Sequence, residues 1–166
     1  MCIRDRYYVS RLSPGKQVGA TPVPAKVLEP PVLGGSETIL LTEDHEGLRD
    51  IAYETLTGLG YHVVVARDGE EALAVFHAHQ REIALAVLDV VLPKLSGPEA
   101  YLRMATETSD LPVIFASGYS TDPALVTKID RPAASFLHKP YTPRDLGRKV
   151  WEALHRAQER RAAKSG

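Results

Sequence analysis

Short runs of hydrophobic residues alternate along this chain with longer segments in which hydrophobic residues recur every three or four positions. The runs are typical of buried strands and the longer segments of amphipathic helices. The predicted strands cover residues 38–42, 62–66, 83–88, 112–116 and 134–138. The predicted helices follow them in turn, over residues 48–59, 69–76, 97–104, 122–129 and 142–154. The pattern is therefore strand then helix, repeated five times.

The predicted strands are hydrophobic throughout and do not alternate with polar residues. This is typical of a parallel sheet that is covered on both faces. Right-handed crossovers through the intervening helices would produce a three-layer, doubly wound α/β fold. In such folds ligands bind beyond the carboxyl ends of the strands, so those positions are the candidate site.

The ends of the chain differ from its middle. Residues 1–36 hold five prolines and four glycines without a helical or alternating hydrophobic pattern, which predicts a disordered linker. The first six residues resemble a translated sequencing adaptor, so we expect a non-native start. The folded domain is predicted over 37–157, with a flexible tail over 158–166.

Composition and charge exclude several classes of protein. The single cysteine, Cys2, rules out an internal disulfide or a site built from several thiolates. No hydrophobic run approaches the length of about 18 residues that a membrane span needs, so we expect no membrane insertion. Residues 37–154 hold 11 basic and 18 acidic residues, and this acidic balance argues against binding to nucleic acid.

Charged and polar side chains stand where the predicted strands end. These residues are Glu43, Asp44, Asp89, Ser117 and Lys139. Carboxylates gathered at one edge of a sheet repel one another by about 4 kcal/mol per pair at an effective dielectric constant of 20. A site of this kind calls for a hard cation with oxygen ligands, Mg²⁺ or Mn²⁺.

The segments around these positions resemble the receiver domain of bacterial two-component response regulators, over about residues 37–157. The motifs are Leu40-Leu41-Thr42-Glu43-Asp44, Leu88-Asp89-Val90-Val91-Leu92-Pro93 followed by Ser96-Gly97, Ala116-Ser117-Gly118-Tyr119, and His138-Lys139-Pro140-Tyr141. The resemblance implies a flavodoxin-like fold, with a five-stranded parallel sheet in the order 2-1-3-4-5 and five flanking helices.

The resemblance also implies a role for each site residue. Asp89 would be the phospho-acceptor, and Lys139 would pair with the phosphoryl group. Asp44, Asp89 and the backbone carbonyl of Val91 would bind Mg²⁺, with help from Glu43 either directly or through water.

Two further residues would form the switch. Ser117 would move to hydrogen-bond the phosphoryl group, and Phe136 would turn inward to fill the space that Ser117 leaves. The resemblance also implies a cis peptide bond between Lys139 and Pro140. Glu43, Ser117 and Phe136 replace the commoner aspartate, threonine and tyrosine of the family but keep the required chemistry. The bulk of Val91 and Tyr119 beside the site predicts slow loss of the phosphoryl group.

The implied function is signal transduction rather than catalysis on a substrate: the domain would catalyse only its own phosphorylation and dephosphorylation. The expected partner is a histidine kinase or a histidine phosphotransfer domain. We expect a monomer or weak dimer in the cytoplasm, and a parent kinase could be anchored in the membrane. The segments 117–120 and 136–141, the proline-rich lead-in and the adaptor-like start favour the C-terminal receiver of a hybrid sensor histidine kinase.

Three alternatives remain open from the sequence. The first is a stand-alone response regulator with a single domain. The second is a Mg²⁺-dependent phosphatase of the haloacid dehalogenase type, although such enzymes need a second carboxylate where this chain has Val91. The third is a pseudo-receiver without phosphoryl chemistry, against which the presence of both Asp89 and Lys139 argues.

Overall fold

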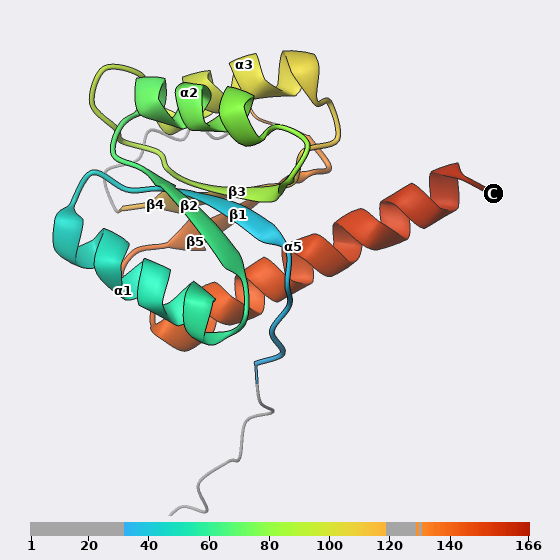
Figure 1. The fold of residues 1–166 in the computed structure, drawn as a ribbon, viewed down its shortest axis with the longest axis horizontal. Helices are drawn as coiled ribbons and strands as arrows, with labels where there is room; N and C mark the ends of the chain where they lie inside the picture. The colour runs from blue at the N-terminus through green and yellow to red at the C-terminus, as the bar shows by residue number, and fades with distance from the viewer. Residues whose placement is uncertain (1–31, 119–128, 130) are drawn as a thin grey trace, which may run out of the picture. The chain divides into compact units, whose positions relative to one another are not determined.

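A computed structural model describes residues 32–118, 129 and 131–166 of the chain. It contains the five predicted strands and four of the predicted helices (Figure 1). The elements are β1 (Thr38–Thr42), α1 (Glu46–Gly58), β2 (His62–Ala66), α2 (Gly69–His79), β3 (Ile83–Asp89), α3 (Gly97–Glu107), β4 (Val113–Ser117), β5 (Ala134–His138) and α5 (Pro143–Lys164). Two predicted segments lie largely outside the described residues: the remaining helix, over 122–129, except for residue 129, and residues 1–31 of the predicted linker.

The strands form one sheet in the order β2-β1-β3-β4-β5, and all four neighbouring pairs are parallel. This confirms the predicted fold and strand order. Every residue of β4 is buried, and so are all but one residue each of β1 and β3, because helices cover both faces of these central strands. The edge strands β2 and β5 are partly exposed.

Helices cover the two faces of the sheet in pairs. Helices α2 and α3 lie against one face, and α1 and α5 against the other (Figure 1). On the first face, Phe76, Tyr101 and Phe115 belong to one hydrophobic cluster, in which Tyr101 meets Phe115 edge-on with ring centroids 5.6 Å apart. On the second, Leu56 and Val150 pack in a cluster that includes buried residues of β1, β3 and β4. The core therefore fixes the sheet from both sides.

Capping side chains in the segments that follow the strands fix where the helices begin. Ser96 and Glu99 form a capping box at α3, and Thr142 and Asp145 form another at α5. Asp68 caps α2 by accepting hydrogen bonds from two backbone N–H groups. These caps satisfy helix donors that would otherwise lack partners, and they fix where each helix begins.

The last helix is longer than the sequence pattern predicted. Residues 158–164, which we expected to be a flexible tail, continue α5 as far as Lys164. Good helix formers and no internal glycine or proline occupy these positions. The Lys164 ammonium also bonds the Asp110 carboxylate at 2.8 Å. Within the described part of the chain, no helix has the length and apolar character that a membrane crossing requires.

Candidate phosphoryl-acceptor site

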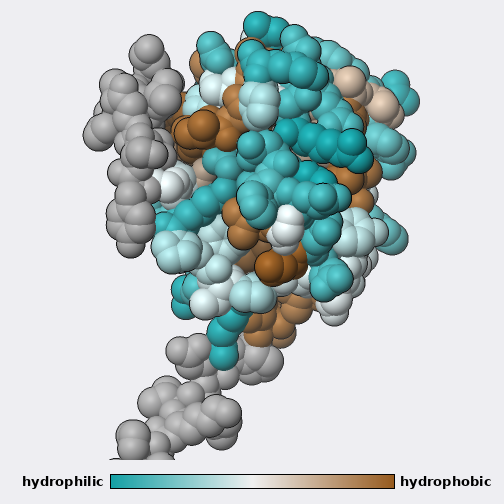
Figure 2. All heavy atoms as spheres, turned by 90° about the vertical axis from the view of Figure 1, so that its left-hand side faces the viewer, coloured by the Kyte–Doolittle hydropathy of each residue, from teal (hydrophilic) through white to brown (hydrophobic). Residues whose placement is uncertain are grey.

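The carboxyl ends of β1, β3, β4 and β5 bring the predicted residues to one edge of the sheet. Asp89 and Ser117 are the last residues of β3 and β4, whereas Glu43 and Lys139 follow β1 and β5 directly. The backbone N–H of Glu43 donates to the carbonyl of Ala66 (3.2 Å), and that of Lys139 to the carbonyl of Ser117 (2.7 Å). Sheet-like bonding therefore extends to the site residues. The described surface at this edge is largely hydrophilic, with small hydrophobic patches (Figure 2).

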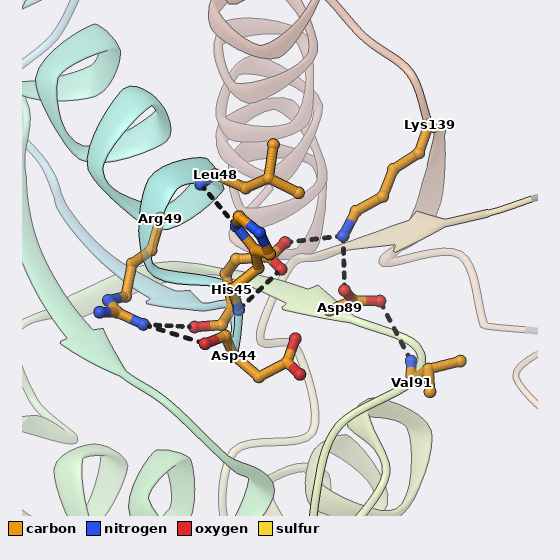
Figure 3. Close-up of polar contacts among 8 residues, drawn as sticks. Asp44, His45, Leu48, Arg49, Asp89, Val91 and Lys139 are labelled. Atoms are coloured by element: carbon orange, nitrogen blue, oxygen red, sulfur yellow. Dashed lines mark hydrogen bonds and ion pairs between the residues drawn. The ribbon is translucent and has the colours of Figure 1, made fainter.

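The Lys139 ammonium lies between two buried carboxylates (Figure 3). Its Nζ atom donates to Asp89 Oδ2 at 2.5 Å and to Glu43 Oε2 at 2.7 Å. Glu43 and Asp89 are only 3% and 8% exposed. Charge-assisted hydrogen bonds of this kind are stronger than neutral ones, and they hold the two carboxylates next to each other.

The neighbouring Asp44 is exposed, in contrast to Glu43. Its carboxylate extends toward the side of the site that holds Asp89 and makes no hydrogen bond or ion pair with any described residue (Figure 3). The turn that carries it is held by Arg49, whose guanidinium donates to the backbone carbonyls of Glu43 (3.1 Å) and Asp44 (3.4 Å). Asp44 is therefore held in place through its backbone, and its side chain is available to a ligand.

Burial and charge shift the ionisation of the site. Burial raises the pKa of the Glu43 carboxyl, and this effect outweighs the bond from Lys139, which lowers it. The pKa of the Lys139 ammonium is raised: burial opposes the charge, but hydrogen bonds to Asp89 and Glu43 more than compensate. Lysine at this position therefore remains charged at neutral pH.

The three carboxylates fit a small divalent cation. Glu43, Asp44 and Asp89 each offer one oxygen, and these oxygens all lie within 4.8 Å of one another. Oxygens on one Mg²⁺ are separated by up to about 4.2 Å, since each Mg–O distance is about 2.1 Å. Only a small side-chain adjustment is needed. Among the described residues, Lys139 is the only cation within hydrogen-bonding distance of any of these three carboxylate groups. Negative charge therefore remains in excess, which also favours a bound cation.

The backbone after Asp89 is fixed on both sides. The Val91 N–H donates to Asp89 Oδ1 at 3.1 Å, while the Val91 residue is 65% exposed beside the site. Gly97 at the start of α3 lies directly against the Asp89 carbonyl. A Cβ atom added to Gly97 would be only 2.1 Å from that oxygen, so no larger residue fits there without a shift of the backbone. Gly97 of the Ser96-Gly97 motif thus has a steric role in positioning Asp89.

The two predicted switch residues lie on neighbouring strands. Ser117 is buried, and its Oγ is 3.2 Å from Nδ1 of His138. Phe136 is partly buried and stacks on Phe115, with ring centroids 5.6 Å apart. The Lys139–Pro140 peptide bond is cis, as the resemblance implied. Tyr119, the other bulky residue that we expected beside the site, lies outside the described residues.

Three contributing residues were not predicted from the sequence. Arg49 holds the turn after β1, His45 donates its backbone N–H to Glu43 Oε1 at 3.3 Å, and His138 contacts Ser117. For His138 a signal existed, because Ser117 and His138 end two strands that would be neighbours in the order 2-1-3-4-5. The contacts of Arg49 depend on the helix start after β1 and have no comparable signal in the sequence.

Comparisons with known proteins identify the family to which this chain is similar. The sequence model of the family described as "Response regulator receiver domain" matches residues 39–150. A probable transcriptional regulator ycf27 of Cyanidium caldarium is 36% identical over 124 residues, covering 75% of this chain and 49% of the regulator. Sensor kinase CckA of Brucella abortus is 33% identical over 155 residues, covering 91% of this chain and 16% of the kinase. The chain thus spans about half or less of these two relatives.

Solved structures give the same result. A response regulator receiver domain protein from Clostridium thermocellum superimposes with a TM-score of 0.66 at 26% identity, covering 74% of this chain and 97% of that one. NtrX from Brucella abortus, in complex with ADP, gives a TM-score of 0.70 at 26% identity, covering 78% of this chain and 30% of that one.

Proposed function

Because the chain belongs to the family of response regulator receiver domains, we propose that Asp89 accepts a phosphoryl group from a phosphohistidine on a partner. The partner is a histidine kinase or a histidine phosphotransfer domain in a two-component system or phosphorelay. The observation that carries the proposal is the contact of Asp89 with Lys139, in a cluster of carboxylates at the ligand-binding edge of the sheet.

In the proposed reaction, a carboxylate oxygen of Asp89 forms a bond to phosphorus. The bond between phosphorus and the partner's imidazole nitrogen breaks, and the imidazole retains the electron pair. The Lys139 ammonium is placed to stabilise negative charge on the phosphoryl oxygens, since it already bonds the acceptor carboxylate. Its raised pKa keeps this charge available at neutral pH.

Mg²⁺ is the cation that the donor set suits, with Mn²⁺ as a substitute. The carboxylates of Glu43, Asp44 and Asp89 would hold it, together with the Val91 carbonyl. When bound, the cation supplies positive charge that offsets the charge of the phosphoryl oxygens.

Phosphorylation would act as a switch and not as turnover of a separate substrate. Ser117 would hydrogen-bond the phosphoryl oxygens, and Phe136 would move inward, changing the surface that partners bind. On this proposal the domain catalyses only its own phosphorylation and dephosphorylation, and it works in the cytoplasm. The phosphatase alternative gains no support, because the exposed side chain of Val91 stands where that chemistry needs a second carboxylate.

We further propose that the domain comes from a hybrid sensor histidine kinase. The similarity to sensor kinase CckA covers 91% of the chain, so it extends beyond the predicted receiver domain, 37–157. The similarity to ycf27 covers 124 residues, 75% of the chain, which is about the length of the predicted receiver domain. A stand-alone regulator is the alternative, and the genomic sequence upstream of this segment distinguishes the two.

Incubation with acetyl phosphate and Mg²⁺, followed by intact mass measurement, tests the phospho-acceptor role. The expected result is an adduct of about 80 Da that needs Mg²⁺ and is absent in Asp89→Asn. The matched control is Asp50→Asn, which changes an exposed aspartate of α1 and should leave the adduct intact. An equal adduct in Asp89→Asn would exclude Asp89 as the acceptor.

A further inference from the structure

The buried hydroxyl of Ser117 has a partner that the proposed chemistry does not use. Its Oγ lies 3.2 Å from Nδ1 of His138, the last residue of β5. Ser117 and His138 are register partners in the parallel β4–β5 pair, so both side chains stand on the same face of the sheet. The backbone bond from Lys139 N–H to the Ser117 carbonyl, at 2.7 Å, fixes this pairing at the edge of the site.

We propose that His138 is a positioning residue that holds the Ser117 hydroxyl in its resting position and so sets how readily the domain adopts its phosphorylated form. The inference rests on the proposed function, because it concerns the residue that would bind the phosphoryl group.

The physical argument is a competition for one hydroxyl. Ser117 is only 3% exposed, and a buried hydroxyl that lacks a hydrogen-bond partner is destabilising. To reach a phosphoryl oxygen, the hydroxyl must give up its bond to His138. The resting form is therefore stabilised by His138, whereas the phosphorylated form is not.

The His138 side chain can be changed without disturbing the core. His138 is exposed, and neither of the two hydrophobic clusters includes it. Removing its ring should destabilise the resting form alone and favour the phosphorylated form. An asparagine at this position can place its amide oxygen close to the position of Nδ1, so it should restore the contact.

Binding of beryllofluoride, a stable mimic of the phosphoryl group, tests the inference on the full chain in the presence of Mg²⁺. Calorimetric titration should show His138→Ala binding about two- to tenfold more tightly than the wild type, the range expected from one hydrogen bond. His138→Asn should bind like the wild type. In a Ser117→Ala background, His138→Ala should have no further effect, because the hydroxyl it acts on is absent.

Each contrary result is informative. Equal affinity of the wild type and His138→Ala, or the same gain in the Ser117→Ala background, would overturn the role of His138. Failure of His138→Asn to restore wild-type affinity would also overturn it. Failure of the proposed function looks different: the wild type would not bind beryllofluoride, or Asp89→Asn would bind it equally well, and the inference would then fall with that function. Thermal unfolding of each variant verifies that the fold is retained.

Discussion

The ammonium of Lys139 bonds the Asp89 carboxylate at 2.5 Å, although the two residues come from strands that are not neighbours in the sheet. The lysine side chain reaches across the end of β4, which lies between β3 and β5. It also bonds Glu43 beside β1, so one cation links the ends of three strands. Lys139 therefore neutralises part of the negative charge of the carboxylates, and it competes with a bound cation for the same carboxylate oxygens.

Replacing Lys139 with methionine should separate these two roles. Phosphorylation of Asp89 by acetyl phosphate should slow by about tenfold to a hundredfold, the cost of one charge-assisted hydrogen bond. Mg²⁺ affinity should rise, because Glu43 and Asp89 lose the cation that offsets their charge. Calorimetry and intact mass measure the two effects. The control is Lys164→Met, which removes the same charge from an exposed ion pair and should change neither the phosphorylation rate nor the Mg²⁺ affinity. A fall in Mg²⁺ affinity in Lys139→Met would contradict the competing role of Lys139.

Asp44→Asn should weaken the cation site without weakening the fold. The Asp44 carboxylate is exposed and bonds no described residue, so the free energy of unfolding should change by less than about 0.5 kcal/mol. Loss of a charged ligand should reduce Mg²⁺ affinity by about tenfold or more. Mg²⁺ titration and urea unfolding without Mg²⁺ measure these values. An unchanged affinity would remove Asp44 from the site, and Asp50→Asn provides the matched control.

Gly97→Ala should disturb the acceptor through its backbone. The added Cβ atom would meet the Asp89 carbonyl oxygen at 2.1 Å, so the start of α3 or the end of β3 must move. We expect a loss of about 1–3 kcal/mol in the free energy of unfolding, together with slower phosphorylation. Gly58→Ala is the control: nothing lies within 4 Å of its added Cβ, and alanine in a helix should stabilise by up to about 1 kcal/mol. Wild-type stability in Gly97→Ala would show that the contact relaxes freely.

Much of the fold and of the candidate site could be predicted from the sequence, because the charged and polar site residues stand at the ends of the predicted strands. Once five hydrophobic strands alternate with helices, their carboxyl ends must lie at one edge, and Asp89, Ser117 and Lys139 are placed together. The strand order was confirmed, but it came from the resemblance and not from the hydrophobic pattern. The end of α5 was misjudged, because hydrophobic periodicity stops near residue 157 while helix propensity continues to Lys164.

Finer features could not be predicted because they depend on register. Glu43 and Asp44 are adjacent and chemically alike, yet Glu43 is buried and Asp44 is exposed. Both faces of β1 are covered, so the usual alternation of hydrophobic and polar residues does not indicate which acid points inward. The bond between Ser117 and His138 also depends on the β4–β5 register, although the predicted strand order already made the ends of these two strands neighbours.

Tyr61 predicts how the fold responds to alkaline pH. Its hydroxyl is buried and has no hydrogen-bond partner among the described residues. Burial, with a smaller contribution from Glu37, raises the pKa of Tyr61 to about 12, whereas in the unfolded chain it is about 10. The folded state therefore binds this proton more tightly, and its stability contribution, complete below pH 10, is lost as the pH rises from about 10 to 12.

Tyr61→Phe should remove this pH dependence, because phenylalanine has no proton to lose. At pH 7 the variant should be as stable as the wild type or up to about 1 kcal/mol more stable, since an unsatisfied buried hydroxyl is deleted. Urea unfolding at pH 7, 10 and 11 measures both effects. The variant should lose less stability than the wild type above pH 10, whereas Tyr53→Phe, at a tyrosine 43% exposed, should follow the wild type. Parallel losses in Tyr61→Phe and the wild type would mean that the buried Tyr61 hydroxyl does not control the alkaline transition.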